Sequence, residues 1–135
     1  MTLYPATDRQ RRLNAANALI QVIASCGKQF FRNKSTGQVA ELTFDWGGRV
    51  WLTDEVTGQR LPAYDTTAHN WRHFSHGQQL RFFIRYLCEY ILDGRKLEQS
   101  IFVHNDGQER WGYGDDIWQV IAAAATADIL AKSKG

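Results

Sequence analysis

The chain has 135 residues, of which 44% are hydrophobic and 22% are charged. This composition excludes a largely disordered chain, and the length suffices to bury a core without metals or disulfides. The formal net charge is +2 and the basic residues are dispersed, so charge alone does not indicate a polyanionic partner. We therefore expect a single domain over residues 1–135, with residues 1–7 and 132–135 frayed.

The sequence indicates neither secretion nor membrane insertion. Met1–Arg12 contains no apolar run that could serve as a signal peptide, and no segment approaches the ~18 consecutive apolar residues of a transmembrane helix. Cys26 and Cys88 are far apart, each within an apolar helical pattern, which favours two buried reduced thiols over a disulfide. We therefore expect a cytoplasmic protein without membrane contact.

A first helix is predicted from about Asp8 to Cys26. Thr7 or Asp8 can cap its start, and Gly27 stands where a left-handed residue commonly ends a helix. Apolar side chains recur on one face at helical spacing, at Leu13, Ala16, Ile20, Ile23 and Ala24. Cations near a helix start are unfavourable for the helix dipole, so either the first turn is frayed or its arginines serve a partner. These arginines are Arg9, Arg11 and Arg12.

Four short strands follow, each bounded by turn residues. They are predicted at Lys28–Asn33, Val39–Trp46, Arg49–Thr53 and Gln59–Tyr64. The second alternates, with its apolar side chains on one face at Ala40, Leu42, Phe44 and Trp46. Gly47 and Gly48 form a hairpin signal, because both can adopt a positive φ. In the third strand we expect Val50 and Leu52 to face inward and Trp51 outward.

The second helix is predicted from a continuous apolar stripe that ends at Gly94. The stripe consists of Leu80, Phe83, Ile84, Leu87, Cys88, Ile91 and Leu92. Ser75 followed by Gln78 has the form of a capping box at its start.

An irregular stretch with a further strand at Ser100–His104 leads to a third helix, capped by Asp115 or Asp116. The fold class predicted is therefore α+β. It comprises an N-terminal helix, an antiparallel four-stranded β-meander and two further helices packed on one sheet face.

The segment from His69 to Gly77, between the last strand and the second helix, is the best candidate for a site. The candidate ligand- or partner-binding residues in this segment are Trp71, Arg72, His73, Ser75 and His76. Arg81 and Trp51 are two further candidates outside it. The N–H groups and dipole at a helix start favour an anion, and Trp71 or Trp51 could stack on a ring. A structural role is the alternative, in which Ser75 caps the helix and Trp71 packs under the sheet edge.

A metal site and catalysis find little support. His69, His73 and His76 are weak candidates for Zn²⁺, because their spacing does not place all three on one helix face and no nearby Cys or Glu completes the set. No strained elbow surrounds Ser75, and the chain has no Walker loop or dinucleotide fingerprint. We expect no cofactor and no catalytic residue.

Several segments together resemble a group of small uncharacterised proteins encoded by bacterial prophages, plasmids and integrative elements. The likeness covers about residues 15 to 120 and lies in five segments: Leu19–Ser25, Gly27 with Phe30 and Phe31, Gly48–Asp54, Trp71–Gly77 and Trp111–Gly114. The resemblance implies an accessory protein of a mobile element inside a bacterial cell, and it carries over no catalytic or binding residue.

Three function classes remain open. The first is a non-catalytic accessory binding protein, for example an inhibitor of a host defence system that binds a host protein or a nucleotide-like anion. The second is a nucleic-acid-binding protein that uses the basic N-terminal arm together with Arg72, Arg81 and Arg85. The third is a small metal-dependent hydrolase centred on the histidines. A homodimer through the strand face that carries Trp51 is also expected, since an exposed aromatic strip is otherwise a liability.

Overall fold

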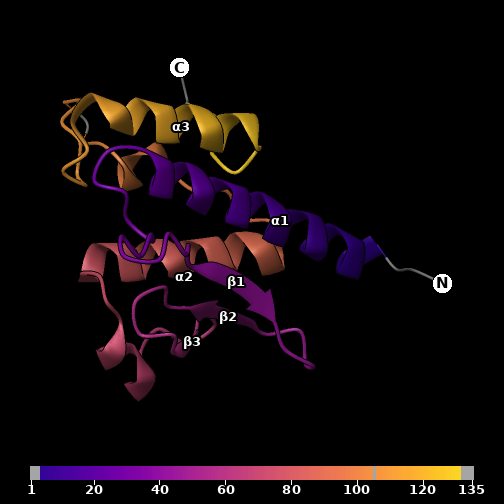
Figure 1. Ribbon diagram of the computed structural model, residues 1–135. Helices are drawn as coiled ribbons and strands as arrows, with labels where there is room; N and C mark the ends of the chain where they lie inside the picture. Colours follow the sequence, from indigo (N-terminus) through magenta and orange to yellow (C-terminus); the bar gives the residue numbers. More distant parts are fainter. Residues whose placement is uncertain (1–3, 105, 132–135) are drawn as a thin grey trace.

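The computed structural model describes residues 4–104 and 106–131, and it has the α+β class that the sequence predicts (Figure 1). Its helices are α1 (Tyr4–Ser25), α2 (Gln78–Asp93) and α3 (Ile117–Thr126). Its strands are β1 (Glu41–Phe44), β2 (Val50–Thr53) and β3 (Arg60–Pro62). Three short 3₁₀ helices lie between them: η1 (His69–His73), η2 (Gln99–Ile101) and η3 (Gly114–Asp116).

The strands form an antiparallel sheet in the order β1-β2-β3. Leu42 pairs with Leu52 and Leu52 with Leu61, so three leucines line one row across the sheet. All three side chains are fully buried, whereas Trp51 is only partly buried, as the period of two along a strand requires. Strand alternation was therefore predicted correctly.

The predicted four-stranded meander is wrong in its first strand. Residues 28–33 instead form turns, with positive φ values of 56° at Gln29 and 67° at Phe31, which an extended strand cannot contain. Only an isolated bridge joins Arg32 to Val39. The tight path brings Phe31 into the core, where its side chain is fully buried. Burial of this ring, and not β propensity, determines the local conformation.

The other predicted strands are shorter than expected. The carboxylate of Asp45 accepts the backbone N–H of Gly47 at 2.8 Å and of Arg49 at 2.9 Å, so the turn begins there and β1 ends at Phe44. Trp46 consequently lies in the turn and is completely exposed, not on the inner face. The predicted strand at Ser100–His104 is also wrong, because this segment contains η2 followed by an isolated bridge at Val103.

The helices stack on one side of the sheet (Figure 1). In this view α2 is drawn between the strands and α1, and α1 contacts β1, α2 and α3. The α2 stripe predicted from the sequence is buried except for Leu92, and Gly94 ends the helix with a φ of 74°. None of the helices within residues 4–104 and 106–131 is long and apolar enough to span a membrane.

The arginines near the start of α1 have a structural use. The helix begins at Tyr4, so a cap at Thr7 or Asp8 is wrong. Arg12 donates to the carbonyl of Ile91 at 2.9 Å, and Arg9 donates to that of Leu92 at 3.1 Å. Cations are favourable at a helix C-terminus, so these side chains stabilise the end of α2 and join α1 to it.

Two further helix caps differ from the predictions. Gly77, not Ser75, occupies the N-cap of α2, and no side chain caps it, so the predicted capping box is wrong. Asp116 stands at the N-cap of α3, one of the two predicted positions, but makes no side-chain cap bond; its oxygens accept the backbone N–H of Gly27 at 3.1 Å and the side-chain N–H of Gln119 at 3.3 Å. Both cysteines are free, and burial raises the pKa of the Cys88 thiol to about 12, which keeps it protonated and unreactive.

The edge of β1 is held by the side chain of Asn17 on α1. Its amide accepts the N–H of Leu42 at 2.8 Å and donates to the carbonyl of the same residue at 2.9 Å. The Asn17 amide therefore occupies hydrogen-bonding positions that a neighbouring strand would otherwise take.

Replacing Asn17 with Ala should lower the free energy of unfolding by about 2 kcal/mol, because each of two hydrogen bonds contributes about 1 kcal/mol. Urea denaturation followed by circular dichroism measures the change. Asn14→Ala is the matched control, since Asn14 is exposed on the same helix and, among the described residues, its side chain bonds only that of Gln10. Equal destabilisation by both variants would show that the Asn17 bonds do not matter.

Candidate functional site

A buried carboxylate joins the β2–β3 turn to the segment that starts α2. Asp54 directly follows β2 and is 1% exposed. One of its oxygens accepts the N–H of Val56 at 2.8 Å and of Thr57 at 3.0 Å, and the other accepts that of Ser75 at 2.8 Å. Burial alone would raise the pKa of Asp54, but these N–H donors outweigh it and hold the pKa below its ordinary value.

The next residue, Glu55, makes a second link to the same segment. Its Oε2 lies 2.8 Å from Nε2 of His76, with the Glu55 side chain 1% exposed and the His76 side chain 15% exposed. The other carboxylate oxygen, Oε1, is buried without a hydrogen-bond partner among the described residues. The Glu55 carboxylate thus fixes the orientation of the imidazole, as a buried acid commonly does beside a functional histidine.

Three aromatic rings lie close to that of His76. Its ring centroid lies 5.1 Å from that of Phe31, 5.4 Å from Phe74 and 5.9 Å from Phe30. Within the described part of the chain, no atom hydrogen-bonds the second ring nitrogen, Nδ1. The histidine therefore combines a fixed orientation with one unused polar atom.

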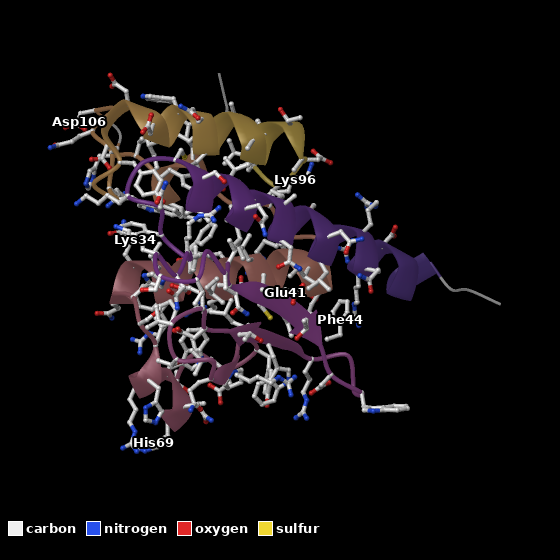
Figure 2. The ribbon with its side chains drawn as sticks, in the orientation of Figure 1. Lys34, Glu41, Phe44, His69, Lys96 and Asp106 are labelled. Atoms are coloured by element: carbon white, nitrogen blue, oxygen red, sulfur yellow. The ribbon has the colours of Figure 1, made fainter. Side chains whose placement is uncertain are left out.

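Two neighbouring pockets meet at His76 and Phe30. One, of about 160 Å³, lies at the start of α2 and is also lined by Gly77, Gln79, Leu80, Arg110 and Trp111. The other, of about 450 Å³, is mostly apolar and is also lined by Lys28, Gln29, Arg32, Asn33, Lys34, Glu55 and Val56. We call these the helix pocket and the lysine pocket. Figure 2 shows Lys34 on the side of the molecule where α2 begins.

The surroundings of the two pockets favour an anion. The first turn of α2 contains no acidic residue, and no side chain of the described residues caps it, so its leading N–H groups are open to an anion. Arg110 lines the helix pocket, and its Nε donates to the carbonyl of Ser100 at 2.6 Å, which holds the side chain in place. Lys28, Arg32 and Lys34 give the lysine pocket three cations, against the one carboxylate of Glu55.

The acid nearest Arg110 in sequence is engaged elsewhere. Glu109 accepts the backbone N–H of Trp111 at 2.8 Å and of Tyr113 at 3.0 Å. Burial would raise the pKa of Glu109, but backbone N–H donors from residues 111–114 outweigh it and lower the pKa. Glu109 thereby shapes the loop that places Trp111 against the helix pocket.

Of the candidate site residues, only His76 lines either pocket. Trp71 is buried in the core and donates its indole N–H to the carbonyl of Pro62 at 2.8 Å, so its role is structural. Ser75 serves through its backbone N–H, which Asp54 accepts. Arg72 and His73 are exposed and lie 3.4 Å apart, Arg72 Nε to His73 Nε2, away from the pockets.

The two candidates outside that segment also lie elsewhere. Trp51 is on the outer sheet face, where its indole N–H donates to Asp45 at 2.9 Å and the Arg60 guanidinium lies 4.8 Å from its ring centroid. Arg81 is partly buried on α2, and its Nε has no hydrogen-bond partner among the residues described. Neither reaches the pockets at His76.

The three histidines do not converge. His69 lies at the end of the molecule away from Lys34 (Figure 2), and His76 is bound to Glu55. Throughout residues 4–104 and 106–131, no group of three or more His, Cys, Asp or Glu side chains could hold a metal ion.

Several site residues were missed from the sequence. From the sequence, Asp54 and Glu55 were treated as ordinary turn residues. Two consecutive acidic residues directly after an apolar strand could have identified them as site candidates. Phe30 was assigned to a strand, and Arg110 lies in a stretch without periodicity. His76 was named as a candidate because it directly precedes a strongly predicted helix.

Replacing Asp54 with Asn should lower the free energy of unfolding at pH 7 by about 2 kcal/mol, since hydrogen bonds to a charged group contribute about 1.5–3 kcal/mol. The folded-state pKa is lowered, so the contribution is present above the ordinary carboxyl pKa of about 4 and is lost as pH falls through the lowered value. Denaturation at several pH values should show the gap between wild type and variant shrinking below about pH 4.

Asp65→Asn is the control for this series. Asp65 is an exposed turn residue whose Oδ1 accepts the N–H and hydroxyl of Thr67, contacts that Asn can keep in part. The assigned role would be contradicted if the difference in unfolding free energy between wild type and Asp54→Asn stayed constant down to pH 2. It would also be contradicted if that difference were no larger than the one for Asp65→Asn.

Comparison with known proteins places the chain in a family. A family model described as YoqU matches residues 6–131, and the chain therefore belongs to the YoqU family. The SPbeta prophage-derived uncharacterized protein YoqU of Bacillus subtilis strain 168 is 27% identical over 109 residues, which cover 81% of this chain and 74% of that protein. The resemblance to uncharacterised phage-encoded proteins is confirmed. No solved structure matches the chain.

Proposed function

We propose that this member of the YoqU family is a non-catalytic accessory protein of a phage that binds a nucleotide-like anion at His76. One observation carries the proposal. The uncapped start of α2 opens onto a pocket lined by His76 and Arg110, and that pocket adjoins a second one lined by Lys28 and Lys34.

The helix pocket suits the phosphate. Backbone N–H groups in the first turn of a helix point outward and carry partial positive charge, and phosphate is a common ligand there. The Arg110 guanidinium can donate a bidentate pair to phosphate oxygens. Nδ1 of His76 supplies a further donor when the imidazole is protonated, with Glu55 balancing that charge at Nε2.

The lysine pocket suits the rest of the ligand. Its lining is mostly apolar, its volume of about 450 Å³ falls within the usual range for small-molecule sites, and Phe30 stands between it and the helix pocket. A ring bound there can pack on Phe30 while Lys28 and Lys34 contact additional phosphates. The two pockets together therefore match a ring joined to a phosphate.

Binding is favoured over nucleophilic catalysis by the partners of His76. Among the described residues, its only hydrogen bond goes to Glu55, and no hydroxyl or thiol bonds to the ring. A nucleophile activated by histidine requires such a contact. For a phage protein, sequestering a nucleotide is one way to inhibit a host defence system, and we include that role in the proposal.

Melting the full chain with a panel of mononucleotides, dinucleotides, cyclic nucleotides and inorganic pyrophosphate tests the proposal. A ligand that binds only the folded state stabilises it by about 2.7 kcal/mol at 100 times its Kd, so the midpoint should rise with concentration. Arg110→Ala and Lys34→Glu should each reduce that rise, because each removes a cation from one of the two pockets.

Arg72→Ala is the matched control, since Arg72 is an exposed cation outside both pockets. It should leave the rise unchanged. If no compound of the panel moves the midpoint, or if Arg72→Ala reduces the rise as much as Arg110→Ala, binding at His76 is disproved.

A further inference from the structure

A shallow groove runs along the outer face of α2, starting next to the helix pocket. It consists of two hollows of about 460 and 310 Å³ that share Tyr86, Ser100 and Ile101. The first also shares Gln79 and Arg110 with the helix pocket. The groove therefore forms a continuous path between α2 and the segment of residues 95–101.

Two aromatic rings on α2 are presented at this groove. Phe82 and Tyr86 are 38% and 37% exposed, and they lie one helical turn apart on the same face. The Arg81 guanidinium lies 5.7 Å from the Phe82 ring centroid, and that of Arg85 lies 5.8 Å from the Tyr86 ring centroid. Each ring therefore has a cation beside it.

Basic side chains outnumber acidic ones along the groove, and one of them, Lys96, forms an ion pair with Asp128 at 2.6 Å. The groove lining contains Arg85, Arg95, Lys96 and Arg110, against the two acids Glu89 and Glu98. Glu89 is itself engaged by two of these cations, with Arg85 at 3.3 Å and Arg95 at 3.2 Å. A positively charged groove lined with exposed aromatic rings is complementary to unpaired bases on a phosphate backbone.

We propose that this groove binds single-stranded nucleic acid, with bases stacked on Phe82 and Tyr86 and phosphates contacting Arg85, Arg95 and Arg110. From Gln79 to Glu89 the helix spans about 15 Å at about 1.5 Å per residue. Phe82 and Tyr86 are about 6 Å apart along this axis, so each ring can take one base. A duplex cannot use the rings in this way, because its bases are already paired and stacked.

This site goes beyond the nucleotide pocket and does not depend on it. Phe82 and Tyr86 line neither the helix pocket nor the lysine pocket. A chain that binds no mononucleotide can still bind an oligonucleotide here, and the reverse also holds.

Fluorescence anisotropy with a labelled ten-nucleotide oligo(dT) and the full chain, at low salt, tests the proposal. Binding should weaken steeply as salt rises, because phosphate contacts release counterions. Phe82→Ala and Tyr86→Ala should each raise the Kd about fivefold or more, the lower end of what loss of one base–aromatic stack produces. Phe82→Leu and Tyr86→Leu, which keep apolar surface but remove the ring, should weaken binding similarly and serve if an Ala variant fails to fold.

Trp118→Ala is the matched control, since Trp118 is an equally exposed aromatic residue, 46% exposed, on α3 and outside the groove. It should leave the Kd unchanged. Three results would each overturn the proposal: no binding at low salt, equal weakening by Trp118→Ala, or equally effective competition by duplex DNA or by poly-glutamate. The last would identify the groove as a general surface for polyanions.

Discussion

The carboxylate of Asp54 is the contact on which the geometry of the site depends. It closes the β2–β3 turn through two backbone N–H groups and holds Ser75 through a third. Because Glu55 is the next residue, the same turn carries the acid that orients His76. The buried start of the β2–β3 turn thus positions both His76 and the start of α2, where Gly77 is the N-cap residue and no side chain caps the helix. Buried carboxylates are costly unless hydrogen-bonded, and Asp54 satisfies that condition with the backbone N–H groups of Val56, Thr57 and Ser75, together with the Ser75 side chain.

The helices could be predicted from the sequence because their signals are local. The apolar stripe of α2 and the left-handed Gly94 at its end need no tertiary information, and both are present in the structure. The prediction of a strand at residues 28–33 was wrong because the conformation of this segment depends on contacts distant in the sequence. Phe30 and Phe31 favour strands, yet the Tyr113 hydroxyl donates to the carbonyl of Ile23 at 2.7 Å and accepts the N–H of Phe30 at 3.1 Å. Contacts more than 80 residues apart in sequence therefore stabilise a turn in place of a strand.

The site was predictable only in part. His76 was identified from its position before a helix, but its partner Glu55 lies 21 residues away, and nothing in the sequence relates the two. For Trp71 the sequence left open a stacking platform or packing under the sheet edge, and the structure has the second, with the carbonyl of Pro62 accepting its indole N–H inside the core. Of the α1 arginines that were considered for a partner surface, Arg9 and Arg12 bind the carbonyls at the end of α2, and Arg11 forms an exposed ion pair with Asp8 at 3.7 Å.

The central claim is that the start of α2 beside His76 is an anion site, and nuclear magnetic resonance of the ¹⁵N-labelled chain titrated with inorganic pyrophosphate tests it most directly. The backbone amides of Gln78, Gln79 and Leu80 and the side-chain Nε–H of Arg110 should shift together and saturate at a common concentration. The indole N–H of Trp51 on the outer sheet face should not move. Amides of the α2 first turn that stay unchanged, or shifts centred on the outer sheet face, would contradict the claim.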